Sequence, residues 1–356
     1  MDINIRLANL SDISHVVGLL EIRDNEVYDR QIMTEYLDYF KPEKIRIWIG
    51  FVNGDSPVGL TMLFLRDIKI NNKIIKAGYW GNLFILPKYR NSMMYIRLVF
   101  EMMRLKKDKE IDLIYGCVRR DDVVKGHIGL GFHSIGTIDV LIKLIQPFKF
   151  ISSYYSIRFI KILGKPLDFI YKTFKDIWAL LLSKKYSITT EDIPINSKIS
   201  IDISNILRNH CSRFISVNWS EEYLLDRYSI TRDGSKYRMF IGNSNEGLIG
   251  IILWRKLKFN NTVTAVIMDI VFEENKLKLI KNLLTKFESF SITQNCQSII
   301  YLNGEKELGY LMKRAFFIKS PIKFNTLIYP KDILVHYPNM NEISNWRFVF
   351  GDHDAF

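Results

Sequence analysis

Strand-like and helix-like segments alternate along the first 145 residues of the chain. Residues 3–8, INIRLA, alternate as a strand does, and Ser11 can cap a helix whose apolar residues recur at helical spacing from Ile13 to Leu20. Asn71-Asn72 is a turn signal between two apolar segments. The other segments predict a helical piece near 29–39, strands over 44–54, 57–70, 74–86, 112–118 and 131–145, a helix over 93–107 and a short helix after Arg120.

The second half of the chain repeats much of this pattern. The octapeptide RDIKINNK, residues 66–73, recurs as RKLKFNNT at 255–262, an offset of 189 residues. A strand segment, an apolar helix and the heptapeptide SIIYLNG follow, and the last matches DLIYGCV at an offset of 186. Four elements in one order at nearly one offset predict a tandem duplication. We therefore expect a first domain over 1–145, a basic amphipathic helical linker over 146–195, and a second domain over 196–356 with a C-terminal strand and an acidic tail.

The element order and several motifs resemble the GNAT acetyltransferase family. LFILPKYRNSMMYIRLVFEMM, residues 83–103, is similar to the family's acyl-CoA segment, and GLGFHSIG, residues 129–136, to the turn that ends its next helix. WSEEYLLDRYS at 219–229 and WRFVFGDHD at 346–354 resemble stretches of bacterial two-domain members, many of them linked to surface-polysaccharide or amino-sugar acylation. The resemblance implies an α/β (α+β) fold with two GNAT-like domains in tandem, each a mixed, mostly antiparallel sheet flanked by helices.

The resemblance also implies an acyl-CoA site in the first domain. In the family, a backbone N–H on the strand before the pyrophosphate loop meets the thioester oxygen, and here that strand end is Leu83, Phe84 and Ile85. The loop and first helical turn that would cradle the pyrophosphate are Arg90, Asn91, Ser92, Met93, Met94 and Tyr95. Met93 and Tyr95 stand where the family has small residues, and Gly81 stands where many members carry a catalytic Glu.

Acyl transfer to an amine needs a group that takes a proton and a group that stabilises the leaving thiolate. The predicted catalytic residues, from the repeated strands and the tail GDHDAF, are Asn82, Tyr115, Asp269, Asp352 and Asp354. The predicted substrate-binding residues are Arg119, at a strand end, Arg227 and Tyr228 of YLLDRY, and His353. Structural interpretations stay open beside these: Asp269 as a buried ion-pair partner, Tyr115 as a core side chain, and the tail as a frayed terminus.

The positive charge of the chain is concentrated in one segment. The formal net charge is +12, and residues 141–186 hold nine Lys or Arg against two Asp, nine minus two being +7. Residues 166–185 place apolar side chains on one helical face. The segment can contact an anionic membrane surface through that face, or join the two domains as a linker that buries it. Because the excess charge is local, nucleic acid is not expected as a partner.

Other features narrow the expected chemistry and location. Cys117, Cys211 and Cys296 have no paired spacing, and the six histidines show no HxxxH or HxH spacing, so we expect neither a disulfide framework nor a metal site. The chain shows no N-terminal apolar segment and no run of about 18 uncharged apolar residues, so a cytoplasmic, non-integral protein is expected, with peripheral membrane contact as an option.

Three functions are compatible with these observations. The first is an N-acyltransferase that uses acetyl-CoA or another acyl-CoA on a small-molecule or sugar amine, and the resemblance implies an amino sugar destined for a surface polysaccharide. The second is a Fem-type transferase that takes its acyl group from aminoacyl-tRNA. The third is a non-catalytic GNAT-like binding or scaffold protein, which the missing small residues and the missing Glu favour. The sequence leaves the oligomeric state open.

Overall fold

The computed structural model describes residues 2–39, 43–54, 56–90, 92–155, 164, 166–174, 177, 181, 188–195, 197–229, 234–259 and 261–352. Its first half follows the predicted element order. The elements are β1 (Ile3–Leu7), η1 (Leu10–Asp12), α1 (Ile13–Asp24), α2 (Arg30–Tyr39), β2 (Ile45–Val52), β3 (Ser56–Ile70), β4 (Lys73–Ile85), η2 (Pro87–Tyr89), α3 (Met94–Lys107), β5 (Leu113–Val118), α4 (Asp121–Gly129) and β6 (His133–Leu144).

The second half repeats this order after α5 (Pro147–Tyr154). Its elements are β7 (Thr189–Pro194), α7 (Ser197–His210), η3 (Cys211–Arg213), β8 (Ser216–Val217), α8 (Glu221–Ser229), β9 (Arg238–Ser244), β10 (Gly247–Phe259), β11 (Thr262–Val271), η4 (Glu274–Lys276), α9 (Leu277–Thr293), β12 (Ser298–Leu302), α10 (Lys306–Arg314) and β13 (Ile318–Tyr329). The chain then continues through α11 (Ile333–His336), η5 (Pro338–Asn341), η6 (Ile343–Asn345) and η7 (Phe350–Asp352). The strand β7, which falls in the predicted linker, pairs with β9.

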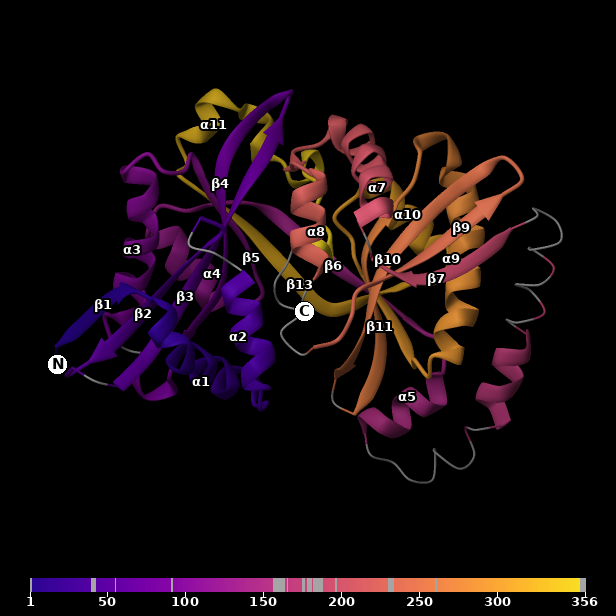
Figure 1. The fold of residues 1–356 in the computed structure, drawn as a ribbon, viewed down its shortest axis with the longest axis horizontal. Helices are drawn as coiled ribbons and strands as arrows, with labels where there is room; N and C mark the ends of the chain where they lie inside the picture. Colours follow the sequence, from indigo (N-terminus) through magenta and orange to yellow (C-terminus); the bar gives the residue numbers. More distant parts are fainter. Residues whose placement is uncertain are drawn as a thin grey trace.

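The two halves share one mixed sheet, with helices on its faces (Figure 1). The strand order is β1-β2-β3-β4-β5-β13-β6-β12-β11-β10-β9-β7, and β8 pairs with β3. The last strand of each half is exchanged: β13 pairs with β5 of the first half, β6 pairs with β12 of the second, and β6 and β13 pair with each other. Each half therefore completes the sheet of the other.

Local sequence explains the two long hairpins that the repeat predicted. Asn71 and Asn72 connect β3 to β4 with φ angles of 47° and 69°, a left-handed conformation that asparagine tolerates. Asn261 has a φ of 63° in the matching turn between β10 and β11. The shared NN dipeptide thus marks the same turn in both halves.

Alternate residues of β4 pack into different hydrophobic clusters, because successive side chains of a strand point to opposite faces. Tyr79 belongs to the cluster that includes α1 and α2 and extends through the second half as far as Phe350. Trp80 belongs to the cluster that includes α3, with side chains of α4 packed against it. Within the described parts of the chain, no helix is long and apolar enough to cross a bilayer.

Candidate functional site

The strand end predicted to meet the thioester contains a β-bulge. The register of β4 against β3 shifts after Gly81, so that Asn82 and Leu83 together lie opposite a single residue, Thr61. Asn82 has a φ of 53°. A β-bulge leaves backbone groups outside the regular hydrogen-bond ladder of the sheet. Here the bulge lies where the sequence predicts that the thioester carbonyl of an acyl-CoA would bind. Of the residues at this strand end that are predicted to meet the thioester oxygen, Leu83 is half-buried, and Phe84 and Ile85 are buried.

A polar cluster that the sequence analysis did not identify surrounds Asn82. Arg23, in the last turn of α1, donates from Nη1 to Asn82 Oδ1 at 2.5 Å and holds Asp24 through two hydrogen bonds of 2.7 Å each. Tyr28 Oη donates to Asp24 Oδ2 at 2.7 Å. The side chains of Arg23 and Asp24 are 19% and 25% exposed, so the cluster is accessible to solvent. In the sequence this cluster corresponds to the charged run EIRDNEVYD at residues 21–29. The run lies beside β4 only through the tertiary fold, so the sequence alone did not link it to Asn82.

The loop predicted to cradle a pyrophosphate is held by its own hydrogen bonds. The carbonyl of Tyr89 accepts the Ser92 N–H at 3.1 Å and the Ser92 hydroxyl at 2.6 Å. Ser92 Oγ in turn accepts the Met94 N–H at 3.2 Å, and Arg90 Nε donates to the last carbonyl of β4 at 3.3 Å. Two of the N–H groups expected to face a phosphate therefore have internal partners. Asn91 lies outside the described residues.

Aromatic rings close the interface between α3 and α4 beside this loop. Met93 is 54% exposed, whereas Tyr95 reaches α4, where its Oη lies 2.5 Å from His127 Nδ1. The His127 ring stacks on Trp80 with centroids 3.7 Å apart, and burial lowers the pKa of His127 to about 4. A Cβ on Gly126 would lie 2.6 Å from Tyr95 Oη. A ligand that followed the first turn of α3 would meet this packed, neutral surface.

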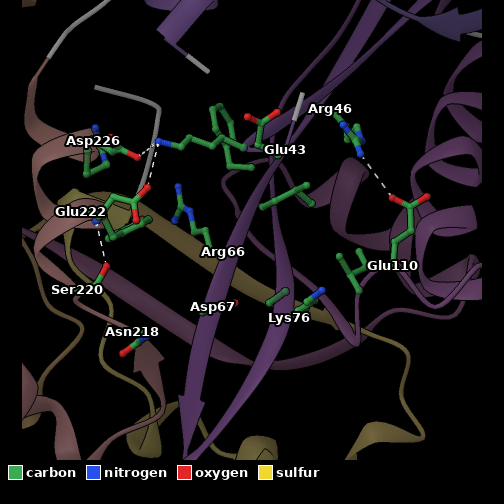
Figure 2. Close-up of a pocket in the computed structure, with 17 residues that line it drawn as sticks. Glu43, Arg46, Arg66, Asp67, Lys76, Glu110, Asn218, Ser220, Glu222 and Asp226 are labelled. Atoms are coloured by element: carbon green, nitrogen blue, oxygen red, sulfur yellow. Dashed lines mark hydrogen bonds and ion pairs between the residues drawn. The ribbon is translucent and has the colours of Figure 1, made fainter. Parts of the chain in front are cut away.

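A pocket of about 490 Å³ lies between β2, β3 and β4 of the first half and α8 of the second (Figure 2). Its walls carry charges of both signs. Lys44 pairs with Asp226 across the two halves, and Arg46 lies 3.6 Å from Glu110. The predicted substrate-binding residue Arg227 is part of the lining.

The pocket and the predicted donor segment occupy different ends of β4. The lining residues of the pocket on this strand are Lys76 and Ala77, whereas the bulge lies at Asn82 and Leu83. Leu83 lies six residue steps beyond Ala77 along the strand, which is about 20 Å of extended chain. A thioester at the bulge and an acceptor in the pocket would therefore not meet.

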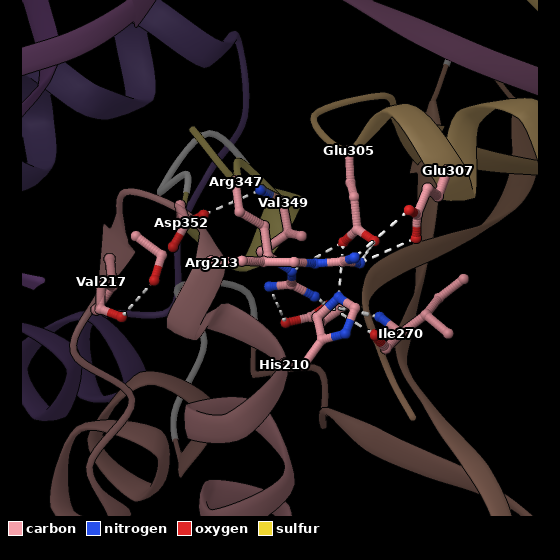
Figure 3. Close-up of polar contacts among 11 residues, drawn as sticks. His210, Arg213, Val217, Ile270, Glu305, Glu307, Arg347, Val349 and Asp352 are labelled. Carbon is pink, nitrogen blue, oxygen red and sulfur yellow. Dashed lines mark hydrogen bonds and ion pairs between the residues drawn. The ribbon is translucent and has the colours of Figure 1, made fainter. Parts of the chain in front are cut away.

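The C-terminal segment 346–352 inserts into the second half and carries a buried ion cluster (Figure 3). Arg347, whose side chain is fully buried, donates to the two carboxylate oxygens of Asp269 at 2.5 and 3.2 Å. Its Nε donates to Glu305 at 3.1 Å, and His210 Nε2 lies 3.0 Å from the same carboxylate oxygen. Burial raises the pKa of Asp269, and the Arg347 charge opposes that rise. The predicted catalytic Asp269 is thus an ion-pair partner inside the core.

The end of this segment lies against the pocket lining. The backbone carbonyl of Asp352 accepts a hydrogen bond from Arg66 Nη1 at 2.7 Å. The side-chain Oδ2 of Asp352 accepts one from the Val349 N–H at 2.9 Å. Asp352 is 2% exposed, and burial raises its pKa to about 6. Arg227 Nε donates to the neighbouring carbonyl of Gly351. The structure therefore brings predicted residues from α8 and from the C-terminus together.

The remaining predicted residues are distributed around these two regions. Tyr115 is buried against Trp346 and Phe348, with ring centroids 5.8 and 6.2 Å apart. Tyr228 is buried and stacks on Trp219 with centroids 6.4 Å apart. Arg119 is exposed after β5, and His353 and Asp354 lie outside the described residues.

The matching connection of the second half, between β11 and α9, borders a cavity of about 640 Å³. Glu273 and Asn275 of this connection line the cavity together with Asn209 and His210 of α7. A carboxylate disfavours a nearby phosphate group. This connection is therefore less suited to a pyrophosphate than one without a carboxylate.

Comparison with known proteins identifies the fold. No protein-family model and no curated protein matches the sequence. The structure is similar to N-myristoyltransferase of Saccharomyces cerevisiae with bound myristoyl-CoA, at a TM-score of 0.64 and 9% identity over 93% of this chain and 79% of that one. It is also similar to a conserved protein of unknown function from Enterococcus faecalis V583 described as a probable N-acyltransferase, at a TM-score of 0.61 and 12% identity. A GCN5-related N-acetyltransferase from Anabaena variabilis ATCC 29413 matches at a TM-score of 0.58 and 10% identity.

Both bacterial matches cover 92% of this chain and 72% of the other. The similarity therefore extends through both halves and confirms the predicted α/β fold, a mixed sheet flanked by helices as in GNAT-type acyltransferases.

Proposed function

We propose that this chain is an N-acyltransferase that takes its acyl group from an acyl-CoA bound at the end of β4 and the start of α3. The observation that carries the proposal is a β-bulge at Asn82–Leu83 followed by a helix N-terminus, on the fold of GNAT-type acyltransferases. The backbone at the bulge would polarise the thioester carbonyl, and the N-terminal end of α3 would face the pyrophosphate. The yeast neighbour, which holds myristoyl-CoA, supports an acyl-CoA as the donor.

In this proposal the polar cluster at the end of α1 receives the acceptor amine. The ammonium form of the acceptor first loses a proton to water. The neutral amine nitrogen then attacks the thioester carbonyl, the C–S bond breaks, and the thiolate takes the second proton that the nitrogen loses. Asp24 and Glu21 would attract the ammonium form of the acceptor, and Arg23 fixes the amide of Asn82 beside the bulge. Arg23 donates two hydrogen bonds to Asp24 and so fixes its carboxylate, which would position the acceptor.

The donor and acceptor can be named more closely as part of the same proposal. Acetyl-CoA as the donor, and an amino sugar destined for a surface polysaccharide as the acceptor, rest on the sequence resemblance to bacterial two-domain acyltransferases. They fit a cluster whose side chains are the carboxylates of Glu21 and Asp24, a guanidinium, an amide and the Tyr28 hydroxyl, the groups that bind amines and sugar hydroxyls.

A second candidate is a non-catalytic protein on the GNAT-type fold. Two observations favour it: the internal hydrogen bonds of Ser92 and Met94, and the closed interface formed by Tyr95, His127 and Trp80. If that loop cannot rearrange, no pyrophosphate can approach the helix end.

Calorimetric titration with acetyl-CoA, myristoyl-CoA and free CoA separates the two candidates. We expect binding of at least one ligand by the intact protein, and a loss of about tenfold or more in Ser92→Asp, because the new carboxylate would face the pyrophosphate. The matched control is Ser11→Asp, which places the same charge at the start of η1 and α1. A folded protein that binds none of the three ligands would overturn the acyltransferase and leave the non-catalytic candidate.

The acceptor cluster is tested by activity in the same preparation. Arg23→Met should lower the rate of thiol release in the presence of amines while leaving acyl-CoA binding within about twofold, since Arg23 contacts Asn82 and not the α3 loop. Equal loss of binding and turnover would place Arg23 in the donor site instead.

A further inference from the structure

The helix over residues 166–174 turns its polar face toward the protein. Asp168 accepts the backbone N–H groups of Phe148 and Lys149 at 3.3 and 2.9 Å. These two residues are in the first turn of α5, which lies at the lower edge of the molecule in Figure 1. The carboxylate thus satisfies N–H groups at the start of α5 and fixes which side of the helix faces inward.

The face away from Asp168 is apolar and exposed. Leu167, Ile170 and Phe174 are 47%, 63% and 63% exposed, and the described residues beyond them, Ile177 and Leu181, are 54% and 55% exposed. At about 100° per residue, Ile170 and Phe174 lie roughly 120–160° from Asp168 around the helix axis. A surface helix of a globular domain normally buries its apolar stripe, so this helix is oriented the opposite way.

The end of α5 extends the same kind of surface. Tyr154 and Tyr155 are 48% and 65% exposed, with their ring centroids 5.0 Å apart. We call the side chains of Tyr154, Tyr155, Leu167, Phe169, Ile170, Phe174, Ile177 and Leu181 the outer apolar surface. Tyrosine is typical of membrane interfaces, because its ring is apolar and its hydroxyl stays hydrated.

The outer apolar surface lies within the most positively charged part of the chain. Residues 141–186 carry nine basic and two acidic residues, or +7. One of the nine, Lys143, is buried against Glu288, so eight minus two leaves +6 for the rest of the segment. A second copy of this chain would bring the same positive excess to the contact, and the two charges would repel. An anionic lipid surface matches both properties, since its headgroups attract lysines and its acyl boundary accepts apolar side chains.

We propose that the outer apolar surface docks the protein on an anionic membrane as a peripheral contact. The apolar side chains enter the headgroup region, and the positive charge of the segment, apart from Lys143, which is buried against Glu288, attracts the anionic headgroups. The contact does not depend on the acyltransferase proposal, because α5 and the helix over 166–174 lie apart from the end of β4.

Co-sedimentation with vesicles tests this surface in the full chain. Wild-type protein should sediment with vesicles of phosphatidylcholine mixed with phosphatidylglycerol, and less with phosphatidylcholine alone or at high salt. The double variant Ile170→Gln/Phe174→Gln should partition about tenfold more weakly, because two exposed apolar side chains no longer enter the interface. The matched control Phe100→Gln/Val335→Gln removes two apolar side chains, 47% and 79% exposed, from other surfaces and should sediment like wild type.

Three results would overturn the proposal. These are no sedimentation with the anionic vesicles, equal sedimentation of the Ile170→Gln/Phe174→Gln variant, and equal loss in the control variant. A concentration-dependent dimer that only the Ile170→Gln/Phe174→Gln variant loses would assign the surface to a second copy of the chain. Because all four replaced side chains are largely exposed, circular dichroism should show each variant folded.

Discussion

Replacing Arg347 by Met removes the cation at the centre of the buried ion cluster while keeping an unbranched side chain of similar reach. The guanidinium makes three hydrogen bonds of 3.2 Å or less, two with Asp269 and one with Glu305. Those two carboxylates are 0% and 1% exposed in their side chains. After the substitution they would lie in the core without this counter-charge.

The expected cost follows from the burial of all three groups. Removing one partner of a buried ion pair costs about 3–5 kcal/mol, because the remaining charge cannot be solvated. Arg120 and Asp122 form a comparable pair on the surface, with side chains 57% and 63% exposed. Breaking that pair with Arg120→Met should cost about 0–1 kcal/mol.

Guanidinium unfolding followed by tryptophan fluorescence and by circular dichroism measures both variants. Trp346, one of six tryptophans in the chain, is buried next to Arg347, so part of the fluorescence change comes from the C-terminal segment. We expect a clearly lower midpoint for Arg347→Met and an unchanged midpoint for Arg120→Met. If the two variants fall within about 1 kcal/mol of each other, the cluster is not a stabilising anchor and the reasoning from burial is wrong.

Two further predictions concern the same segment. The pKa of Asp352 is about 6 in the folded state against an ordinary value of 3.8, so the folded protein holds this proton more tightly. This difference contributes about 3 kcal/mol at most to the free energy of unfolding. The contribution is present below pH 4 and is lost as the pH rises through 6. Asp352→Asn should flatten that part of a stability profile measured from pH 4 to 8, and an unchanged slope would contradict this. Gly304→Ala should destabilise the protein by roughly 1–3 kcal/mol, because the added Cβ would lie 1.9 Å from the Phe348 carbonyl oxygen. Gly18→Ala, with nothing within 4 Å in α1, should instead stabilise it by up to about 1 kcal/mol, and thermal melts compare the two.

The element order could be predicted because its signals are local. Apolar periodicity and the Asn71-Asn72 turn depend on residues close together in the chain, and the structure places the expected elements there. The exchange of β6 and β13 could not be predicted in this way. The pattern of apolar and polar residues in a strand shows which face each side chain occupies, but it does not show which strands lie on either side.

The sequence predicted the part of the candidate site that is continuous in the chain, but not the contacts between distant residues. The segment predicted to bind the acyl donor is continuous in the chain, and the structure has the end of β4 and the start of α3 there, as the sequence pattern predicts. The contact between Arg23 and Asn82 joins residues 59 apart, and that between Arg347 and Asp269 joins residues 78 apart. The sequence does not show which distant residue a charged side chain will contact, because that depends on tertiary packing.

The direction of the strands explains why the two halves differ in their sites. β4 is parallel to β5 and β11 is parallel to β12, but three antiparallel pairings, β5–β13, β13–β6 and β6–β12, separate the two pairs. β4 and β11 therefore run in opposite directions and end at opposite edges of the sheet. At the end of β11, Arg347 binds Asp269 and Phe348 bridges to Gly304 just after β12, so the C-terminal segment occupies the place between these strand ends. The duplicated fold thus anchors its own C-terminus at one edge, and the acyl-CoA site that we propose lies at the opposite edge, with the bulge and α3.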